Sequence, residues 1–276
     1  MKTVSVGSVK FSNVLPFSLI SGNCALESKD HSFLVCDALK KACDKLGIGF
    51  VYKSSFDKAN RTSLSSKRGV GMDEGLKILE AVKKEFGVPV VTDVHEISQV
   101  EAVGKIVDIV QIPALLSRQT DLLIAAGKTG KTVNVKKGQF IAPWDIGRAA
   151  DKISKSTGND NVLLTDRGTS FGYNGIVVDM TGLAVMAETG YPVIMDATHG
   201  IQMPSAGCGV SSGNREHAKL IARSAIAAGV AGIFIETHED PDNAPCDGPN
   251  SIKLSDMAAL LAQLKEIDTI IKEKKA

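Results

Sequence analysis

Eight short apolar runs in this chain each end in a side chain that can ionise, hydrogen-bond or bind a metal. In chain order, these end residues are Cys24, Lys53, Asp93, Gln111, Lys136, Arg167, His199 and Glu236. Any one of them could simply begin an exposed loop, but the recurrence at all eight ends is hard to explain by solvation alone. The pattern predicts one shared site built from the ends of the runs.

Six basic residues lie at or just after these ends. They are Lys53, Lys58, Arg61, Arg118, Lys136 and Arg167. If the ends converge, these cations form a positive cavity, and Arg binds phosphate or carboxylate through paired hydrogen bonds. One phosphate does not require so many cations, so we expect two phosphorylated substrates, or one phosphate together with a carboxylate. Taken alone, Lys58 and Arg61 would fit a solvated loop equally well.

A second subset carries the donor atoms of a transition-metal site. Cys24, His199, Glu236 and Asp247 offer a thiolate, an imidazole and two carboxylates, which suit a divalent ion such as Zn, Fe, Mn or Co. Cys24 could instead be a small buried hydrophobic residue, and His199 a general acid or a hydrogen-bonded loop residue. The glycines of 69–75 lack the GxGxxG spacing and do not directly follow a strand, so no organic cofactor is expected.

The elements that must position these residues alternate regularly. The apolar runs cover 17–24, 48–55, 88–95, 107–114, 132–140, 161–168, 191–199 and 230–238. They are short and rich in Val and Ile, which is typical of parallel strands covered on both faces. Amphipathic segments between them indicate helices, and those at 29–47 and 73–87 close with Gly.

Eight such units favour a closed (β/α)8 barrel over an open doubly wound sheet. A barrel gathers the C-terminal ends of its strands at one mouth and places the first strand beside the eighth, which would bring Cys24 and Glu236 together. The 276 residues are expected to form one domain, 1–276. Residues 4–16 predict a β-hairpin over the barrel base, and the long loops 202–214 and 239–250 predict lids or walls of the site.

The charge balance excludes some classes of protein. Lys plus Arg number 32 and Asp plus Glu 31, so a nucleic-acid binder that works through bulk positive charge is not expected. No signal peptide is evident and no apolar run reaches the length of a membrane span, which favours a cytoplasmic location. The 5 cysteines include no CxxC pair, which favours a reducing compartment over a disulfide framework.

Several motifs resemble those of one enzyme family. They are YKSSFDKANRTS (52–63), TDVHE (92–96), QIPALLSRQTDLL (111–123), NVKKGQF (134–140), TDRGTSFGYN (165–174) and DATHGIQMP (196–204). The motifs are similar to those of the 3-deoxy-D-manno-octulosonate 8-phosphate synthases, also called 2-dehydro-3-deoxyphosphooctonate aldolases, and the resemblance spans almost the whole chain. Its most specific part is Asp-Lys-Ala-Asn-Arg at 57–61, where the sister heptulosonate-phosphate synthases typically carry Lys-Pro-Arg-Thr.

The resemblance implies condensation of phosphoenolpyruvate with D-arabinose 5-phosphate and water, giving the octulosonate 8-phosphate and phosphate for the lipopolysaccharide core. Phosphoenolpyruvate would be held by Lys58, Arg118, Lys136 and Arg167. Arabinose 5-phosphate would be held by Asn60, Arg61 and Ser63, with Asp93 near its hydroxyls. Lys53 and Gln111 complete the expected substrate-binding set, and the expected catalytic residues are Lys58, Asp93, His199 and Asp247.

The family contains metal-dependent and metal-independent members. The metal-independent members carry Asn where this chain has Cys24, so the resemblance implies the metal-dependent class, and it also implies a homotetramer. Three alternatives stay open from the sequence. They are the sister synthase that uses erythrose 4-phosphate, a metal-dependent barrel hydrolase that needs only water, and a sugar-phosphate sensor without chemistry.

Overall fold

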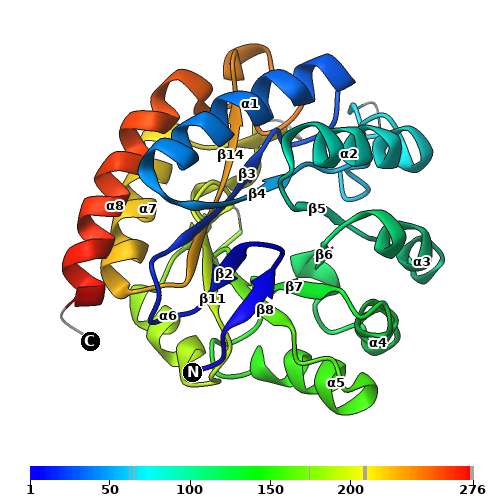
Figure 1. Cartoon of the computed structure of the whole chain (residues 1–276), viewed down its shortest axis with the longest axis vertical. Coiled ribbons are helices and arrows are strands. Elements are labelled where there is room, and N and C mark those ends of the chain that lie inside the picture. Colours follow the sequence, from blue (N-terminus) through cyan, green and yellow to red (C-terminus); the bar gives the residue numbers. More distant parts are fainter. Residues whose placement is uncertain (62, 65, 174, 208–209, 274–276) are drawn as a thin grey trace.

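The computed structural model of the chain shows a ring of helices around a barrel of strands (Figure 1). It describes residues 1–61, 63–64, 66–173, 175–207 and 210–273, and the segments 204–207 and 210–212 are described at the level of the backbone. Cys208 of the long loop at 202–214 lies outside the described residues. In the described part of the chain, no helix has both the length and the apolar character needed to cross a lipid bilayer.

Eight parallel strands form the barrel. They are β3 (Ser18–Gly22), β4 (Gly49–Lys53), β5 (Val90–Asp93), β6 (Ile109–Ile112), β7 (Thr132–Lys136), β8 (Val162–Asp166), β11 (Val193–Asp196) and β14 (Gly232–His238). Each strand pairs with the next, and β14 pairs with both β11 and β3, so the sheet closes on itself. The predicted (β/α)8 barrel is confirmed.

The described residues include eight α-helices. They are α1 (Lys29–Leu46), α2 (Met72–Phe86), α3 (Ile97–Ile106), α4 (Thr120–Lys128), α5 (Gly147–Thr157), α6 (Met180–Ala187), α7 (Arg215–Ala228) and α8 (Met257–Glu273). α1 begins where the Ser28 side chain accepts a hydrogen bond from the backbone N–H of His31 at 3.1 Å. It ends at Gly47, whose φ of 64° is the left-handed conformation that glycine adopts at little cost.

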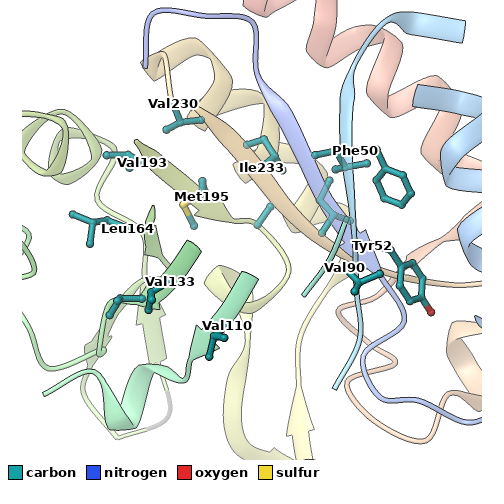
Figure 2. Close-up of a cluster of buried hydrophobic side chains, with 14 of the residues drawn as sticks. Phe50, Tyr52, Val90, Val110, Val133, Leu164, Val193, Met195, Val230 and Ile233 are labelled. Carbon is teal, nitrogen blue, oxygen red and sulfur yellow. The ribbon is translucent and has the colours of Figure 1, made fainter. Parts of the chain in front are cut away.

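Side chains on the outer face of the strands form the layer between barrel and helices. Figure 2 shows Val110, Val133, Leu164, Met195 and Ile233 in this layer, each buried. Because successive strand residues point to opposite faces, the alternate residues of the same strands point into the barrel. Both faces of each strand are therefore covered, which explains the nearly continuous apolar runs in the sequence.

The predicted N-terminal hairpin is confirmed, and it fills the base of the barrel. β1 (Val4–Val6) pairs antiparallel with β2 (Val9–Phe11). The hairpin buries four apolar side chains against the inward residues of the strands, so that hairpin and barrel interior form one cluster: Val4, Val6, Val9 and Phe11 with Ile20, Val51, Val91, Ile109, Leu163, Ile194, Ala231 and Phe234. In Figure 1 the hairpin lies across the centre of the ring.

Inward positions become polar toward the C-terminal ends of the strands. Two residues beyond Val51, Val91, Ile109, Ile194 and Phe234 of the apolar layer stand Lys53, Asp93, Gln111, Asp196 and Glu236, all of them buried. The step of two residues keeps the side chains on the inner face and moves them one layer toward the mouth. The barrel thus has an apolar base and a polar upper layer.

Shorter elements extend the loops at the mouth. β9 (Thr169–Phe171) follows β8 directly and is exposed, and it pairs antiparallel with β10 (Gly175–Val177), which is partly buried. β12 (Met203–Gly207) and β13 (Val210–Ser212) form a hairpin within the predicted loop 202–214. β15 (Ile252–Lys253) pairs in parallel with β14 after the second long loop. Long chain segments therefore stand around the mouth of the barrel.

The hairpin at the base predicts a stability effect. We expect Phe11→Ala to lower the free energy of unfolding by about 3–5 kcal/mol, because the ring is fully buried and its removal leaves a cavity. Lys10→Ala, on the exposed face of the same strand, should change it by less than about 0.5 kcal/mol. Urea unfolding followed by circular dichroism measures both, and equal effects would contradict the role of the hairpin.

Candidate active site at the barrel mouth

A cavity of about 390 Å³ opens at the C-terminal ends of the strands. Ten of the residues predicted from the sequence line it: Lys53, Lys58, Asn60, Arg61, Asp93, Gln111, Lys136, Arg167, His199 and Asp247. Most come from different strands or the loops that follow them, so closure of the barrel is what brings them together. The cavity is the convergent site that the strand ends predict.

Four predicted residues do not line this cavity. Cys24 and Glu236 lie buried close to its wall, with relative exposures of 5% and 1%. Ser63 is half-buried in the loop after Arg61. Arg118 is exposed, and its backbone oxygen accepts a hydrogen bond from Lys152 at the surface. Within one chain, Arg118 and Ser63 are therefore not among the residues that line the cavity.

The Glu236 carboxylate is surrounded by positive charge. Its Oε1 accepts a hydrogen bond from Lys53 Nζ at 3.0 Å, and Lys58 Nζ lies 3.6 Å away. Burial alone would raise the pKa of Glu236, but Lys58, His199 and Lys53 outweigh it and hold that pKa well below its usual value. Burial likewise disfavours the charged Lys58, but the negative charges around it raise its pKa. Both groups are therefore ionised near neutral pH.

The other Glu236 oxygen belongs to a set of possible metal ligands. Glu236 Oε2 is buried and has no hydrogen-bond partner among the described residues, although His199 Nε2 lies 3.6 Å away. Asp247 Oδ2 lies 3.8 Å from His199 Nε2 and 3.4 Å from Cys24 Sγ. Cys24, Glu236 and Asp247 offer ligand atoms within 4.8 Å of one another. An unpartnered buried carboxylate oxygen beside a thiol, an imidazole and a second carboxylate fits a divalent ion.

Asp196 orients the histidine of this set. Its Oδ2 lies 2.7 Å from His199 Nδ1, which leaves Nε2 directed toward Glu236 and Asp247. A carboxylate on the second ring nitrogen is the usual support of a metal-binding histidine. Burial would lower the pKa of His199, but Asp196 and Glu236 raise it above the ordinary value.

Asp247 is fixed by its neighbours. It has a φ of 48°, uncommon for a residue other than glycine, and its backbone oxygen accepts from the N–H groups of Asn250 and Ser251. Gln202 donates to Asp247 Oδ1 at 3.1 Å and accepts from Arg167 Nη2 at 2.8 Å. Burial opposes ionisation of Asp247, but the nearby His199 side chain outweighs it and lowers the pKa of Asp247 to about 2. Gln202 thus connects the set of possible metal ligands to the cations.

Lys136 is a cation in an unusual environment. It pairs with Asp196, and its Nζ lies 3.5 Å from the centre of the Phe234 ring in the apolar layer. Burial lowers the pKa of Lys136 to about 8, although Asp196 opposes this shift. A lysine with such a pKa loses part of its charge within a moderately alkaline range.

Two guanidinium groups have unused donors near the cavity. Arg167 Nη1 and Arg61 Nε are buried, and neither has a hydrogen-bond partner within the described part of the chain. Arg61 Nη2 donates to the backbone oxygen of Pro245 at 3.1 Å, which ties its loop to the segment before Asp247. Because buried donors are normally satisfied, these two nitrogens indicate places for the oxygens of anionic ligands.

Asp93 occupies the wall near Lys53 and Lys58. It accepts a hydrogen bond from Ser55, and its Oδ2 lies 3.0 Å from His95 Nε2. Burial would raise the pKa of Asp93, but His95 and the two lysines lower it. Asp93 is therefore an ionised carboxylate that can accept hydrogen bonds from a ligand hydroxyl.

Sequence reasoning missed four residues of this site: Ser55, His95, Asp196 and Gln202. Asp196 carried a usable signal, because it lies two residues beyond the inward Ile194, as Glu236 lies two beyond Phe234. Gln202 had no such signal, since it lies in a loop whose path only the structure gives.

The comparisons with known proteins agree with this geometry. The sequence profile of the DAHP synthetase I family matches residues 4–273, so the chain belongs to that family. Within it, the chain is 58% identical to the 2-dehydro-3-deoxyphosphooctonate aldolase of Agrobacterium fabrum, over 96% of this chain and 93% of the relative. It is 57% identical to the protein of the same name from Brucella ovis, over 98% and 97% of the two chains.

The shifted pKa of Lys136 predicts how anion binding depends on pH. Its amine is charged below about pH 8 and neutral above, so the affinity of the cavity for sulfate should fall as pH rises through 8, by up to about tenfold per unit. Sulfate keeps its own charge across this range. Calorimetric titrations from pH 7 to 9.5 should show a flatter profile for Lys136→Arg, and identical profiles would exclude Lys136 as the titrating cation.

Proposed function

We propose that the chain condenses phosphoenolpyruvate with D-arabinose 5-phosphate and water, giving 3-deoxy-D-manno-octulosonate 8-phosphate and phosphate. The observation that carries this proposal is a pair of buried guanidinium nitrogens, on Arg61 and Arg167, that have no hydrogen-bond partner among the described residues and lie in a cavity rich in cations. They offer binding positions for two anionic groups, as two phosphorylated substrates require. The 2-dehydro-3-deoxyphosphooctonate aldolases that match this chain over nearly all of their length give the same reaction class.

The two substrates divide the cavity between them in this proposal. Lys136 and Arg167 bind the phosphate and carboxylate of phosphoenolpyruvate, together with Lys58. Asn60 and Arg61 bind the phosphate of arabinose 5-phosphate, and Asp93 accepts hydrogen bonds from the sugar hydroxyls. Holding two anions in attacking geometry contributes up to about 7–11 kcal/mol to catalysis when the arrangement is good.

The chemistry forms one carbon–carbon bond. C3 of phosphoenolpyruvate attacks the aldehyde carbon of arabinose 5-phosphate, a water molecule adds at C2, and phosphate leaves by cleavage of its C–O bond. The buried cations stabilise the negative charge that moves during these steps. Lys58, Asp93 and His199 lie where they can carry protons to the new hydroxyl or from the water. In this scheme the enzyme is a transferase.

The proposal includes a divalent metal ion bound by four side chains of the site. Cys24, His199, Glu236 and Asp247 would hold it, and Zn, Fe, Mn and Co all suit such donors. When bound, the ion would supply Lewis-acid polarisation of the aldehyde or of water. His199 is held for this role by Asp196, and Asp247 by Gln202.

The alternatives are less well supported. Erythrose 4-phosphate is the substrate of the sister synthases, but residues 57–61 lack their Lys-Pro-Arg-Thr motif, and the high-identity relatives bear the octonate name. A hydrolase would need no second anion site. A sensor without chemistry would have no need of ionised Asp93 and Lys58 beside the ligands.

A rate measurement tests the reaction and the metal together. We expect phosphate release with phosphoenolpyruvate and arabinose 5-phosphate, loss of more than about 90% of the rate after EDTA, and recovery when Mn, Zn, Fe or Co is added. Cys24→Asn should lower the affinity for the added metal by about 10–100-fold.

The outcomes separate the two parts of the proposal. Full activity in EDTA would retain the synthase and remove the metal. Turnover with erythrose 4-phosphate in place of arabinose 5-phosphate would favour the sister reaction. Phosphate release without any aldose would point to a hydrolase. Cys36→Ser is the matched control for the cysteine variant, because Cys36 is buried in the helix layer away from the ligand set.

The proposed assembly is a homotetramer. Large apolar side chains at the cavity rim are exposed, among them Leu115 at 55%, Phe140 at 58% and Tyr173 at 104%. Exposed apolar patches of this kind mark interaction surfaces. A second copy packed on the rim would cover them and would complete the wall of the cavity.

Sedimentation velocity tests this assembly. We expect the wild-type chain to sediment as a tetramer and Phe140→Asp to shift the population toward smaller species, because a charge on the rim is costly to bury. Leu220→Asp places the same charge at an exposed position on α7 and should leave the assembly unchanged. A wild-type monomer would refute the proposal.

A further inference from the structure

A cluster of two histidines and two glutamates lies outside the site described above. Glu27, His31 and His238 place one ligand atom each within 4.8 Å of one another, and Glu239 is the fourth member. Glu27 precedes α1, His31 lies in its first turn, and His238 ends β14. None of the four lines the cavity at the barrel mouth. We propose that Glu27, His31 and His238 bind a second divalent ion, of the zinc type, distinct from the ion of the Cys24 set.

The ring of His31 is arranged as a ligand. Its Nε2 lies 2.6 Å from Glu239 Oε2, and a carboxylate can only accept, so Nε2 carries the proton. In the neutral ring, the other nitrogen, Nδ1, then carries the lone pair. It is buried and makes no hydrogen bond within the described part of the chain, although it lies 3.3 Å from Glu27 Oε1. A lone pair held beside a carboxylate oxygen at this separation matches two neighbouring ligands of one ion.

His238 supplies the third ligand. Its Nε2 lies 3.0 Å from the same oxygen, Glu27 Oε1. Without an ion, Nδ1 of His238 accepts the backbone N–H of Asp240 at 3.0 Å, so Nε2 donates its proton to Glu27. Binding of the ion moves this proton to Nδ1, which lies 3.4 Å from Glu239 Oε2, and the Asp240 N–H gives up its acceptor. Glu239 then accepts from both rings, the usual arrangement behind metal-binding histidines.

The donor set selects the kind of ion. Two imidazoles and one carboxylate, with water as the fourth ligand, suit the tetrahedral N and O coordination of zinc. Calcium and magnesium prefer sites made wholly of oxygen ligands. Glu27 and Glu239 have side-chain exposures of 37% and 42%, so an ion from solution can reach the cluster.

The place of the cluster gives the ion a structural role. β14 and β3 are the strands whose pairing closes the barrel between the end and the beginning of the chain. The ion would connect the segment after β3 to the end of β14, a few residues beyond Cys24, which follows β3, and Glu236, which lies on β14. It would stabilise the closure of the barrel, and no chemical step depends on it.

Zinc stoichiometry tests the proposal separately from activity. We use a background variant, Cys24→Asn with His199→Gln, that weakens the other ligand set. Equilibrium dialysis and atomic emission should find two zinc ions per wild-type chain and one per background chain. Adding His31→Leu to the background should weaken the remaining site at least tenfold, because the imidazole ligand is lost. His217→Leu, which removes an exposed histidine on α7, should retain one ion.

Thermal unfolding gives a second readout. Zinc at about 100 times its Kd should raise the Tm of the background variant by about 5 °C, and the rise should vanish with His31→Leu but not with His217→Leu. A background variant that binds no zinc, or one whose binding is unchanged by His31→Leu, would overturn the proposal. Either result leaves the condensation reaction untouched. Far-UV circular dichroism establishes that each variant is folded.

Discussion

The ion pair between Glu236 and Lys53 is the interaction on which the site depends. Both side chains are almost wholly buried, and a buried charge without a partner is very unfavourable. The two buried charges stabilise each other because β14 and β4 flank β3 in the closed barrel, which holds Lys53 Nζ and Glu236 Oε1 3.0 Å apart. It also keeps Glu236 ionised, leaving Oε2 available as a ligand while Oε1 serves the lysine. The same closure of the barrel therefore both completes the fold and keeps the Glu236 carboxylate ionised in the site.

The fold and much of the site could be predicted from the sequence, for a physical reason. Strands covered on both faces appear in the sequence as continuous apolar runs, and each run is interrupted by a polar residue where the strand reaches the mouth of the barrel. Lys53, Asp93, Gln111 and Lys136 were found from such breaks, and all of them line the cavity. The end of α1 could be predicted in the same way, because a helix that ends in a left-handed residue favours glycine at that position, and Gly47 stands there.

The features of the site that could not be predicted from the sequence depend on contacts between segments far apart in the chain. Gln202 joins Arg167 to Asp247, and nothing in the loop sequence indicates this. Arg118 was grouped with the site because it follows a strand end, but the turn after β6 leaves it exposed. The cluster of His31 and His238 was missed because its members come from opposite ends of the chain, and neither lies at an inward position near the cavity.

The hairpin fills the base of the barrel, so among the described residues the site is open to solvent at the mouth. Phe11 and its neighbours fill the lower end, so substrates, water and products share the mouth as entrance and exit. Lys136 lies over the Phe234 ring at the floor of the cavity, whereas Arg61 lies at the rim, where it contacts the loop that contains Pro245. A ligand bound at the rim would obstruct the path of another ligand to the floor. In the division of the cavity proposed above, phosphoenolpyruvate binds next to Lys136 and the sugar phosphate next to Arg61, so the first would bind before the second.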